Sequence, residues 1–164
     1  MKLIASFTVD HDKLEKGMYI SRIDGDAVTY DIRMKKPNGG DYLSNGALHT
    51  FEHLFATYVR NGRFSDSVIY VGPMGCRTGF YFILRDSVKP QEAIDLVKES
   101  FKFIADFTGE IPGAKRRECG NYLEHDLGGA KNTAEDMLFV LKNWKEEDLK
   151  YLSLIHISEP TRPY

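Results

Sequence analysis

Alternating hydrophobic and polar residues predict strands in the first half of the chain. Residues 27–34 place apolar side chains at every second position, which is the period of a strand with one buried face. Two compact runs rich in β-branched and aromatic residues follow at 68–71 and 80–84, separated by the short link 74–79. A short link favours antiparallel pairing, because a parallel pair needs a long crossover.

Apolar residues at helical spacing predict three helices. The first lies between a capping residue, Ser44 or Asn45, and the stop signal Asn61–Gly62. A second helix begins at Pro90, a favourable first-turn residue, and ends near Thr108–Gly109. We expect the third at about 133–144, where the predicted buried stripe is Met137, Leu138, Leu141 and Trp144.

These elements predict one α/β domain of the α+β type, with a largely antiparallel sheet packed against two or three long helices. The chain has 164 residues and a mass of 18.7 kDa, enough for one domain with a substantial core. We assign residues 1–151 to this domain. Residues 152–164 have two prolines among their last five and no helical period, so we expect an atypical C-terminal tail that is not part of the fold.

Charge and composition exclude several classes of partner. A formal net charge of −2 gives no basis for binding nucleic acid or an anionic membrane. The N-terminus lacks the apolar run of a secretory signal, and no segment approaches the ~20 apolar residues of a membrane span. We therefore expect a cytoplasmic protein, in which Cys76 and Cys119 stay reduced and serve as a ligand or a reactive thiol.

The predicted helix after Ser44 carries the densest group of chemically active residues. At about 100° per residue, His53 lies about 40° from His49 on one side and Glu52 about 60° on the other. Two histidines at i and i+4 can bind one metal ion, and His-x-x-Glu-His is also a metallopeptidase signature. The opposite side of the helix collects the apolar residues Phe51, Leu54, Phe55 and Tyr58.

Two histidines need a third protein ligand if the metal is to be catalytic and keep one open position. Cys119 is a strong candidate, since a thiolate suits zinc or ferrous iron and Gly120 lets the backbone approach closely. The rivals are His125, Glu124 and Asp126. With two acidic neighbours, His125 is expected to be a surface imidazole rather than a ligand.

Cys76 and Glu52 are candidates for proton transfer. Cys76 lies in a segment with three glycines in eight residues, and these glycines can present a thiol at a bend between two strands. The alternative for Cys76 is a small buried side chain. Glu52 lies between two candidate ligands on a face turned away from the core, so general acid/base work is favoured over a solvated carboxylate.

Five separated blocks of residues together resemble the S-ribosylhomocysteine lyase family, the autoinducer-2 production proteins. The resemblance extends from about Lys2 to about Asp148. The blocks are Ser6-Phe7-x-x-Asp10-His11, Asp31-Ile32-Arg33, His49-Thr50-x-Glu52-His53-Leu54, the segment from Gly72 to Tyr81, and Cys119-Gly120-Asn121-Tyr122.

This resemblance implies a homodimer that cleaves S-ribosylhomocysteine to homocysteine and 4,5-dihydroxypentane-2,3-dione, the autoinducer-2 precursor. It implies carbonyl migration and β-elimination with a divalent metal, ferrous iron or zinc, and no organic cofactor. By motif, it assigns the metal to His49, His53 and Cys119. The same carry-over makes Cys76 and Glu52 catalytic, and it places Ser6, His11 and Arg33 near the ribose, the N-terminal ones in the neighbouring subunit's site.

Two departures and two rival functions accompany the resemblance. Tyr70 stands where family members often carry an acidic residue near the homocysteine end of the substrate, and the tail from about Leu152 does not match the family. An inverted-motif zinc peptidase would share His-x-x-Glu-His but take a carboxylate as third ligand, leaving Cys76 and Cys119 without a role. A non-catalytic metal-binding module would need a closed set of four ligands.

Overall fold

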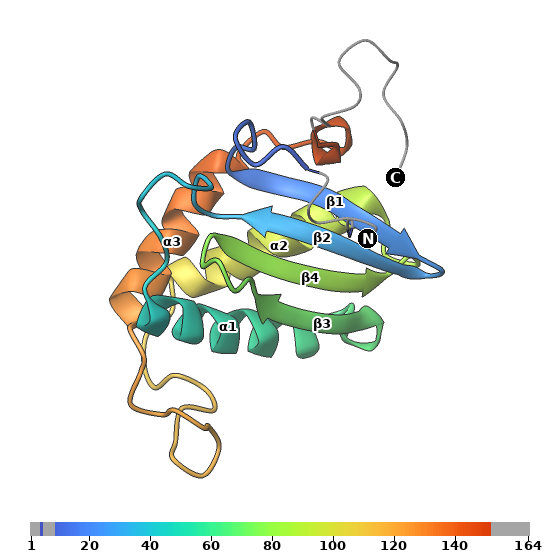
Figure 1. The fold of residues 1–164 in the computed structure, drawn as a ribbon. Helices are drawn as coiled ribbons and strands as arrows, with labels where there is room; N and C mark the ends of the chain where they lie inside the picture. The colour runs from blue at the N-terminus through green and yellow to red at the C-terminus, as the bar shows by residue number, and fades with distance from the viewer. Residues whose placement is uncertain (1–3, 5–8, 152–164) are drawn as a thin grey trace.

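A computed structural model describes residue 4 and residues 9–151, so Ser6 and the predicted tail 152–164 lie outside the described residues. Its sheet has four strands in the order β1-β2-β4-β3, and every neighbouring pair is antiparallel (Figure 1). The strands are β1 (Gly17–Asp24), β2 (Ala27–Arg33), β3 (Val68–Pro73) and β4 (Gly79–Arg85). The predicted strands are confirmed, whereas β1 was not predicted, because its apolar residues Met18, Tyr19 and Ile20 form a short consecutive run and not an alternation.

The three helices pack on one face of this sheet (Figure 1). They are α1 (Asn45–Arg60), α2 (Pro90–Ala105) and α3 (Leu127–Val140), with short 3-10 helices η2 (Ser65–Ser67) and η3 (Glu146–Leu149) between and after them. The fold class is therefore as predicted. Among the described residues, no helix is long and apolar enough to span a membrane.

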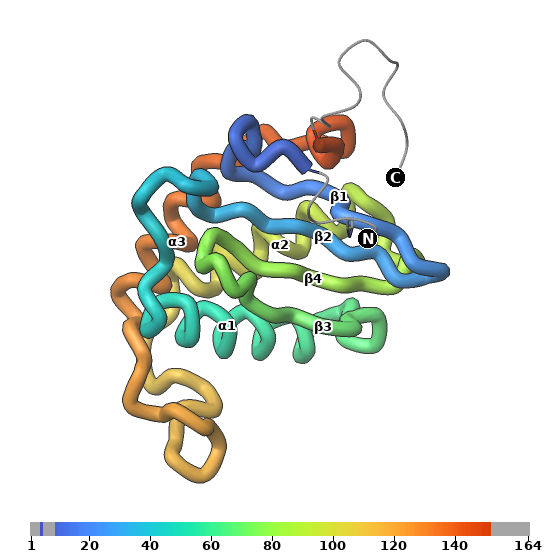
Figure 2. Tube along the Cα trace, viewed as in Figure 1, coloured from blue at the N-terminus to red at the C-terminus, as the bar shows by residue number. Residues whose placement is uncertain are grey.

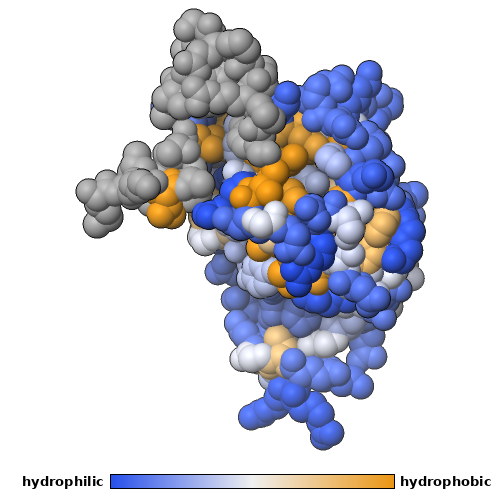
Figure 3. Space-filling view, turned by 90° about the vertical axis from the view of Figure 1, so that its right-hand side faces the viewer, coloured by the Kyte–Doolittle hydropathy of each residue, from blue (hydrophilic) through white to orange (hydrophobic). Residues whose placement is uncertain are grey.

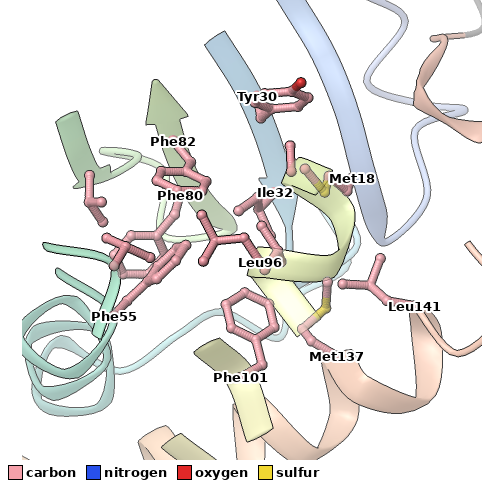
Figure 4. Close-up of a cluster of buried hydrophobic side chains, with 14 of the residues drawn as sticks. Met18, Tyr30, Ile32, Phe55, Phe80, Phe82, Leu96, Phe101, Met137 and Leu141 are labelled. Atoms are coloured by element: carbon pink, nitrogen blue, oxygen red, sulfur yellow. The ribbon is translucent and has the colours of Figure 1, made fainter. Parts of the chain in front are cut away.

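The core lies between the sheet and the helices and is rich in aromatic rings (Figure 4). Phe80 and Phe82 point inward from β4, because side chains two apart on a strand share a face. Phe55 of α1 contacts both, with ring centroids 6.4 and 5.0 Å away. Phe101 of α2 packs edge-on against Phe55 with centroids 5.3 Å apart. This packing fixes which face of α1 is buried.

Both ends of α1 follow the sequence prediction. The Ser44 side chain accepts a hydrogen bond from the Ala47 amide, which makes it the N-cap, and Asn61 is the C-cap. The buried side of the helix includes Phe51, Leu54 and Phe55, which are 1%, 0% and 0% exposed.

The third helix begins earlier than predicted, at Leu127 rather than near 133. The Asp126 side chain caps it by accepting a hydrogen bond from Gly129, and the glycine pair after Leu127 hides the helix in the sequence pattern. The predicted end was also wrong, because Trp144 lies beyond the helix and its indole Nε1 donates to the Met18 carbonyl at 2.9 Å. Trp144 therefore fastens the chain after α3 to β1.

Residues 106–126 form a long irregular connection that projects beside the start of α1 (Figure 2).

A side view of the surface shows hydrophobic groups gathered in the upper half and mostly hydrophilic groups below (Figure 3). The sheet face away from the helices carries the exposed Tyr70. Tyr70 shares a hollow there with Ser21, Thr29, Tyr81 and Ile83.

Candidate metal centre and reactive thiol

The face of α1 opposite the core presents His49, Glu52 and His53, as the helical wheel predicts. The two imidazole rings lie edge to face, with centroids 4.7 Å apart. Both histidines and Glu52 are half-buried. The apolar face holds the helix against the core, and the two histidines on the other side contact the connection 106–126.

Backbone carbonyls of that connection orient both histidine rings. Nδ1 of His49 lies 2.8 Å from the Glu124 carbonyl oxygen, and Nδ1 of His53 lies 2.8 Å from the Pro112 carbonyl oxygen. A carbonyl only accepts, so each Nδ1 must carry the proton and each Nε2 keeps its lone pair. Both rings are thus held in the tautomer that binds a metal through Nε2.

Gly113 lets the connection approach His53 closely. Its backbone has a φ of +67°, and a Cβ at this position would lie 3.3 Å from Nδ1 of His53. Only glycine adopts this left-handed conformation without strain. The position of the Pro112 carbonyl therefore depends on the residue that follows it.

Cys119 comes from the same connection and brings a thiol to the two rings. Its Sγ lies 3.3 Å from Nε2 of His49. One candidate ligand atom from each of His49, His53, Cys119 and His125 falls in a group whose members all lie within 4.8 Å of one another. Imidazole nitrogens with a thiolate are the donors that zinc and ferrous iron accept, so the residues present fit a divalent metal of this kind.

His125 belongs to this group and is not the surface imidazole that its acidic neighbours suggested. Its ring stacks on His49 with centroids 4.0 Å apart and planes inclined by 20°. Burial, and then the neighbouring His49 and His53, lower the pKa of His125. Its Nδ1 lies 2.9 Å from the Thr50 hydroxyl, whereas Nε2 is buried without a hydrogen-bond partner.

The two carboxylates that rivalled Cys119 as ligands serve other purposes. The Glu124 carboxylate accepts a hydrogen bond from Asn121 at 3.3 Å, and Glu124 reaches His49 through its backbone carbonyl instead. The Asp126 carboxylate caps α3. Neither acid belongs to the metal-binding group among the described residues.

Cys76 lies at the tip of the β3–β4 hairpin and is exposed, so it is not the small buried side chain that was its alternative. Its Sγ lies 3.0 Å from the Thr78 hydroxyl. The hairpin turns with a positive φ of 61° at Arg77, not at a glycine. The glycines were expected to present Cys76 at a bend, which explains only part of their role. Gly79 is also needed because an added Cβ would lie 2.1 Å from the Ile32 carbonyl oxygen.

Arg33 and Cys76 both contact the hydroxyl of Thr78. Arg33 donates from Nη1 to Thr78 Oγ1 at 2.9 Å, and its other nitrogens donate to both carboxylate oxygens of Asp31. Tyr151 also donates to Asp31, at 2.6 Å. Burial opposes the charge of Arg33, but the ion pair with Asp31 outweighs it and raises the pKa of the guanidinium. The cation is thus fixed beside the thiol.

The structure describes one of the two N-terminal residues predicted to lie near the ribose. His11 is half-buried and its Nδ1 contacts the Val9 carbonyl at 2.9 Å. Ser6 lies outside the described residues. Among the described residues, no hydrogen bond joins the group of Cys76, Thr78 and Arg33 to the histidines of α1. Sequence reasoning missed Thr50 and Thr78, and their only signal was their place inside the matching blocks.

Comparison with known proteins gives consistent matches. The family model described as S-ribosylhomocysteinase (LuxS) matches residues 4–148. The chain is 49% identical over 157 residues to the S-ribosylhomocysteine lyase of Phocaeicola vulgatus, covering 92% of this chain and 98% of that protein. It is 47% identical over 156 residues to the lyases of Clostridium acetobutylicum and Borreliella burgdorferi, covering 92% of this chain and 99% of each relative.

Proposed function

Because the chain belongs to the S-ribosylhomocysteine lyase family, we propose that it cleaves the thioether of S-ribosylhomocysteine. The products are homocysteine and 4,5-dihydroxypentane-2,3-dione, from which autoinducer-2 forms. The observation that carries this proposal is the meeting of His49, His53 and Cys119 in one group. These are the family-motif residues to which the resemblance assigns the metal.

In this proposal His49, His53 and Cys119 hold the metal, with ferrous iron as the native ion and zinc as a substitute. The carbonyl contacts of both Nδ1 atoms support this assignment, because they leave Nε2 of each ring available. A divalent metal supplies Lewis acidity toward the sugar's oxygen atoms. The two carboxylates that a peptidase would use are engaged elsewhere, so the peptidase alternative is not favoured.

Cys76 moves protons between the sugar's carbon atoms. A thioether leaves poorly from an unactivated carbon, so the carbonyl must first migrate until the carbon bearing sulfur is β to it. At each step a base removes a proton from one carbon and returns it to the next, which changes no oxidation state overall. The exposure of Cys76 and the fixed cation of Arg33 beside it suit a thiol that alternates between base and acid.

Glu52 handles the hydroxyl protons and the final elimination. In that step a proton leaves the carbon between the carbonyl and the C–S bond, a carbon–carbon double bond forms, and sulfur departs with the C–S electron pair. Protonation of the sulfur gives homocysteine. The position of Glu52 between two ligands on one helix face supports this role.

We further propose a homodimer in which Ser6 and His11 complete the neighbouring subunit's site and Arg33 lies near the ribose. The open sheet face, where the exposed Tyr70 and the half-buried Tyr81 line one hollow, supports an interface between two subunits. We place the protein in the cytoplasm, because the reaction needs Cys76 and Cys119 as free thiols.

The test is homocysteine release measured with a thiol reagent. Reduced, iron-loaded protein is incubated with S-ribosylhomocysteine, and chelator-treated protein is the control. We expect stoichiometric thiol release that stops after chelation and returns when metal is restored. Absence of thiol release from the reduced, metal-loaded protein would overturn the proposed function.

A further inference from the structure

Nε2 of His125 is a buried side-chain nitrogen without a hydrogen-bond partner, and among the described residues no other buried side-chain nitrogen or oxygen atom lacks one. His125 belongs to the same group as the three proposed ligands. A buried nitrogen of this kind costs free energy unless a partner is supplied, so the group is built to receive one. The partner is either the metal itself or an acceptor atom bound next to it.

The Thr50 hydroxyl decides between these two partners. Thr50 is fully buried, with 0% exposure, and its Oγ1 accepts a hydrogen bond from the Asp126 amide at 2.9 Å. The hydroxyl proton must still be donated, because a buried donor left unpaired is costly. Within the described part of the chain, the one acceptor in hydrogen-bonding reach of Oγ1 is Nδ1 of His125.

Two other buried hydroxyls on helices show that Thr50 is unusual. Ser100 Oγ donates to the Leu96 carbonyl at 2.7 Å, and Thr133 Oγ1 donates to the Gly129 carbonyl at 2.9 Å. Both use the carbonyl four residues earlier, which is the ordinary outlet for a hydroxyl on a helix. Thr50 does not use it, so its proton is directed at the imidazole of His125.

We propose that His125 is a hydrogen-bond donor in the metal centre and not a fourth metal ligand. Thr50 donates to Nδ1, so Nε2 of His125 carries the ring's proton and has no lone pair for a metal. With a metal held by His49, His53 and Cys119, this N–H would be available within the same group to donate to an oxygen atom of water or of substrate.

The proposal rests on the proposed metal site and gives its third histidine a distinct role. His49 and His53 face carbonyl oxygens and keep Nε2 free for a metal, whereas His125 faces a hydroxyl and takes the opposite tautomer. The same imidazole side chain thus serves as ligand or donor according to the group behind it. A donor here stabilises negative charge that develops on the sugar's carbonyl oxygen at each proton removal.

The competing arrangement is a closed site with four protein ligands. It requires Nδ1 of His125 to be protonated and to donate to Thr50, which leaves the Thr50 proton without an acceptor among the described residues. It would also leave no position for substrate. The two arrangements therefore predict opposite protonation of one ring, which can be measured.

The decisive experiment is nitrogen-15 NMR of the histidine rings in full-length, zinc-loaded protein. We expect His49 and His53 to show protonated Nδ1 and coordinated Nε2, and His125 to show protonated Nε2 and unprotonated Nδ1. Coordinated Nε2 on His125 would overturn the donor role. That result would leave the proposed function intact, since the function is tested separately by thiol release from the unaltered protein.

Paired variants supply a second measurement. Thr50→Ser keeps the hydroxyl and should keep the His125 tautomer, whereas Thr50→Val removes it and should abolish the preference for protonated Nε2. His125→Phe should still retain one metal per subunit after purification, while kcat for thiol release falls about 100-fold, as for loss of one donor to a developing oxyanion. Loss of metal from His125→Phe as complete as from Cys119→Ala would contradict the proposal.

Discussion

Sγ of Cys119 lies 3.3 Å from Nε2 of His49, although 70 residues separate them in the sequence. The thiol is delivered by an irregular connection, and the imidazole is fixed by a carbonyl of that same connection. Metal binding would therefore couple the connection to α1. We expect Cys119→Ala to lower the metal content of the purified protein well below one ion per subunit, measured by atomic emission.

Cys76→Ala separates chemistry from metal binding. Cys76 contacts Thr78 and belongs to no metal-binding group among the described residues, so its loss should leave metal content unchanged. We expect homocysteine release to fall by at least about 10³-fold, as when a general acid/base is removed. Equal loss of metal from this variant and from Cys119→Ala would contradict the separate roles.

The sequence predicted those parts of the fold whose hydrophobic period is uninterrupted. The helix α1 and the pair β3 and β4 were predicted because their apolar positions repeat regularly between clear capping and turn residues. β1 was not predicted, because its short apolar run is followed by mostly polar residues up to Asp24. The start of α3 was not predicted, because Gly128–Gly129 interrupt the helical pattern. In both places tertiary packing overrides a weak local signal.

The candidate site divides in the same way. Spacing on one helix predicted that His49 and His53 lie side by side, and this is confirmed by ring centroids 4.7 Å apart, whereas the role of Glu52 beside them stays a prediction. The pairing of His125 with Thr50, and of Arg33 with Thr78, could not be predicted, because each joins segments far apart in the sequence. Such hydrogen bonds carry no periodicity, and only three-dimensional contact reveals them.

Asp31→Ala should be strongly destabilising, because it leaves the Arg33 guanidinium buried without its partner. The two side chains are 2% and 4% exposed. Removing one member of a buried ion pair costs about 3–5 kcal/mol, measurable by urea unfolding. Arg22 and Asp24 are likewise two residues apart and joined by two hydrogen bonds, but they lie at the surface. Asp24→Ala is therefore the matched control and should change stability little.

Alkaline pH should destabilise the fold through its buried tyrosines. Burial raises the pKa of both Tyr19 and Tyr30 from 10.0 to about 12. Between pH 10 and 12 the unfolded chain loses these protons while the folded protein keeps them, so stability present below pH 10 is lost as pH rises through this window. The loss is about 2–3 kcal/mol for each group.

Tyr30→Phe provides the comparison for that titration. The variant lacks one of these buried tyrosines, so its free energy of unfolding should decline less steeply than that of the unaltered protein between pH 10 and 12. Parallel declines in the two proteins would show that Tyr30 does not titrate as its burial implies. Chemical unfolding at fixed pH values measures the difference directly.

Gly113→Ala tests whether the shape of the connection 106–126 controls metal affinity. The backbone φ of +67° strains any residue with a Cβ, and here the Cβ would also lie 3.3 Å from Nδ1 of His53. The substitution should therefore displace the Pro112 carbonyl that orients this ring. We expect about 1–2 kcal/mol of lost stability. Metal affinity should also weaken by about 10- to 100-fold, as it does when a group that orients a metal ligand is disturbed.

Gly25→Ala is the matched control for this prediction. Gly25 has a φ of +61° in the β1–β2 turn, and a Cβ there would meet nothing within 4 Å. The backbone strain is the same, but no metal-binding residue is nearby. Both variants should lose similar stability in urea, and competition with a chelator should show weakened metal binding for Gly113→Ala alone. Equal metal affinities in the two variants would mean that the Pro112 carbonyl does not hold His53 in its binding orientation.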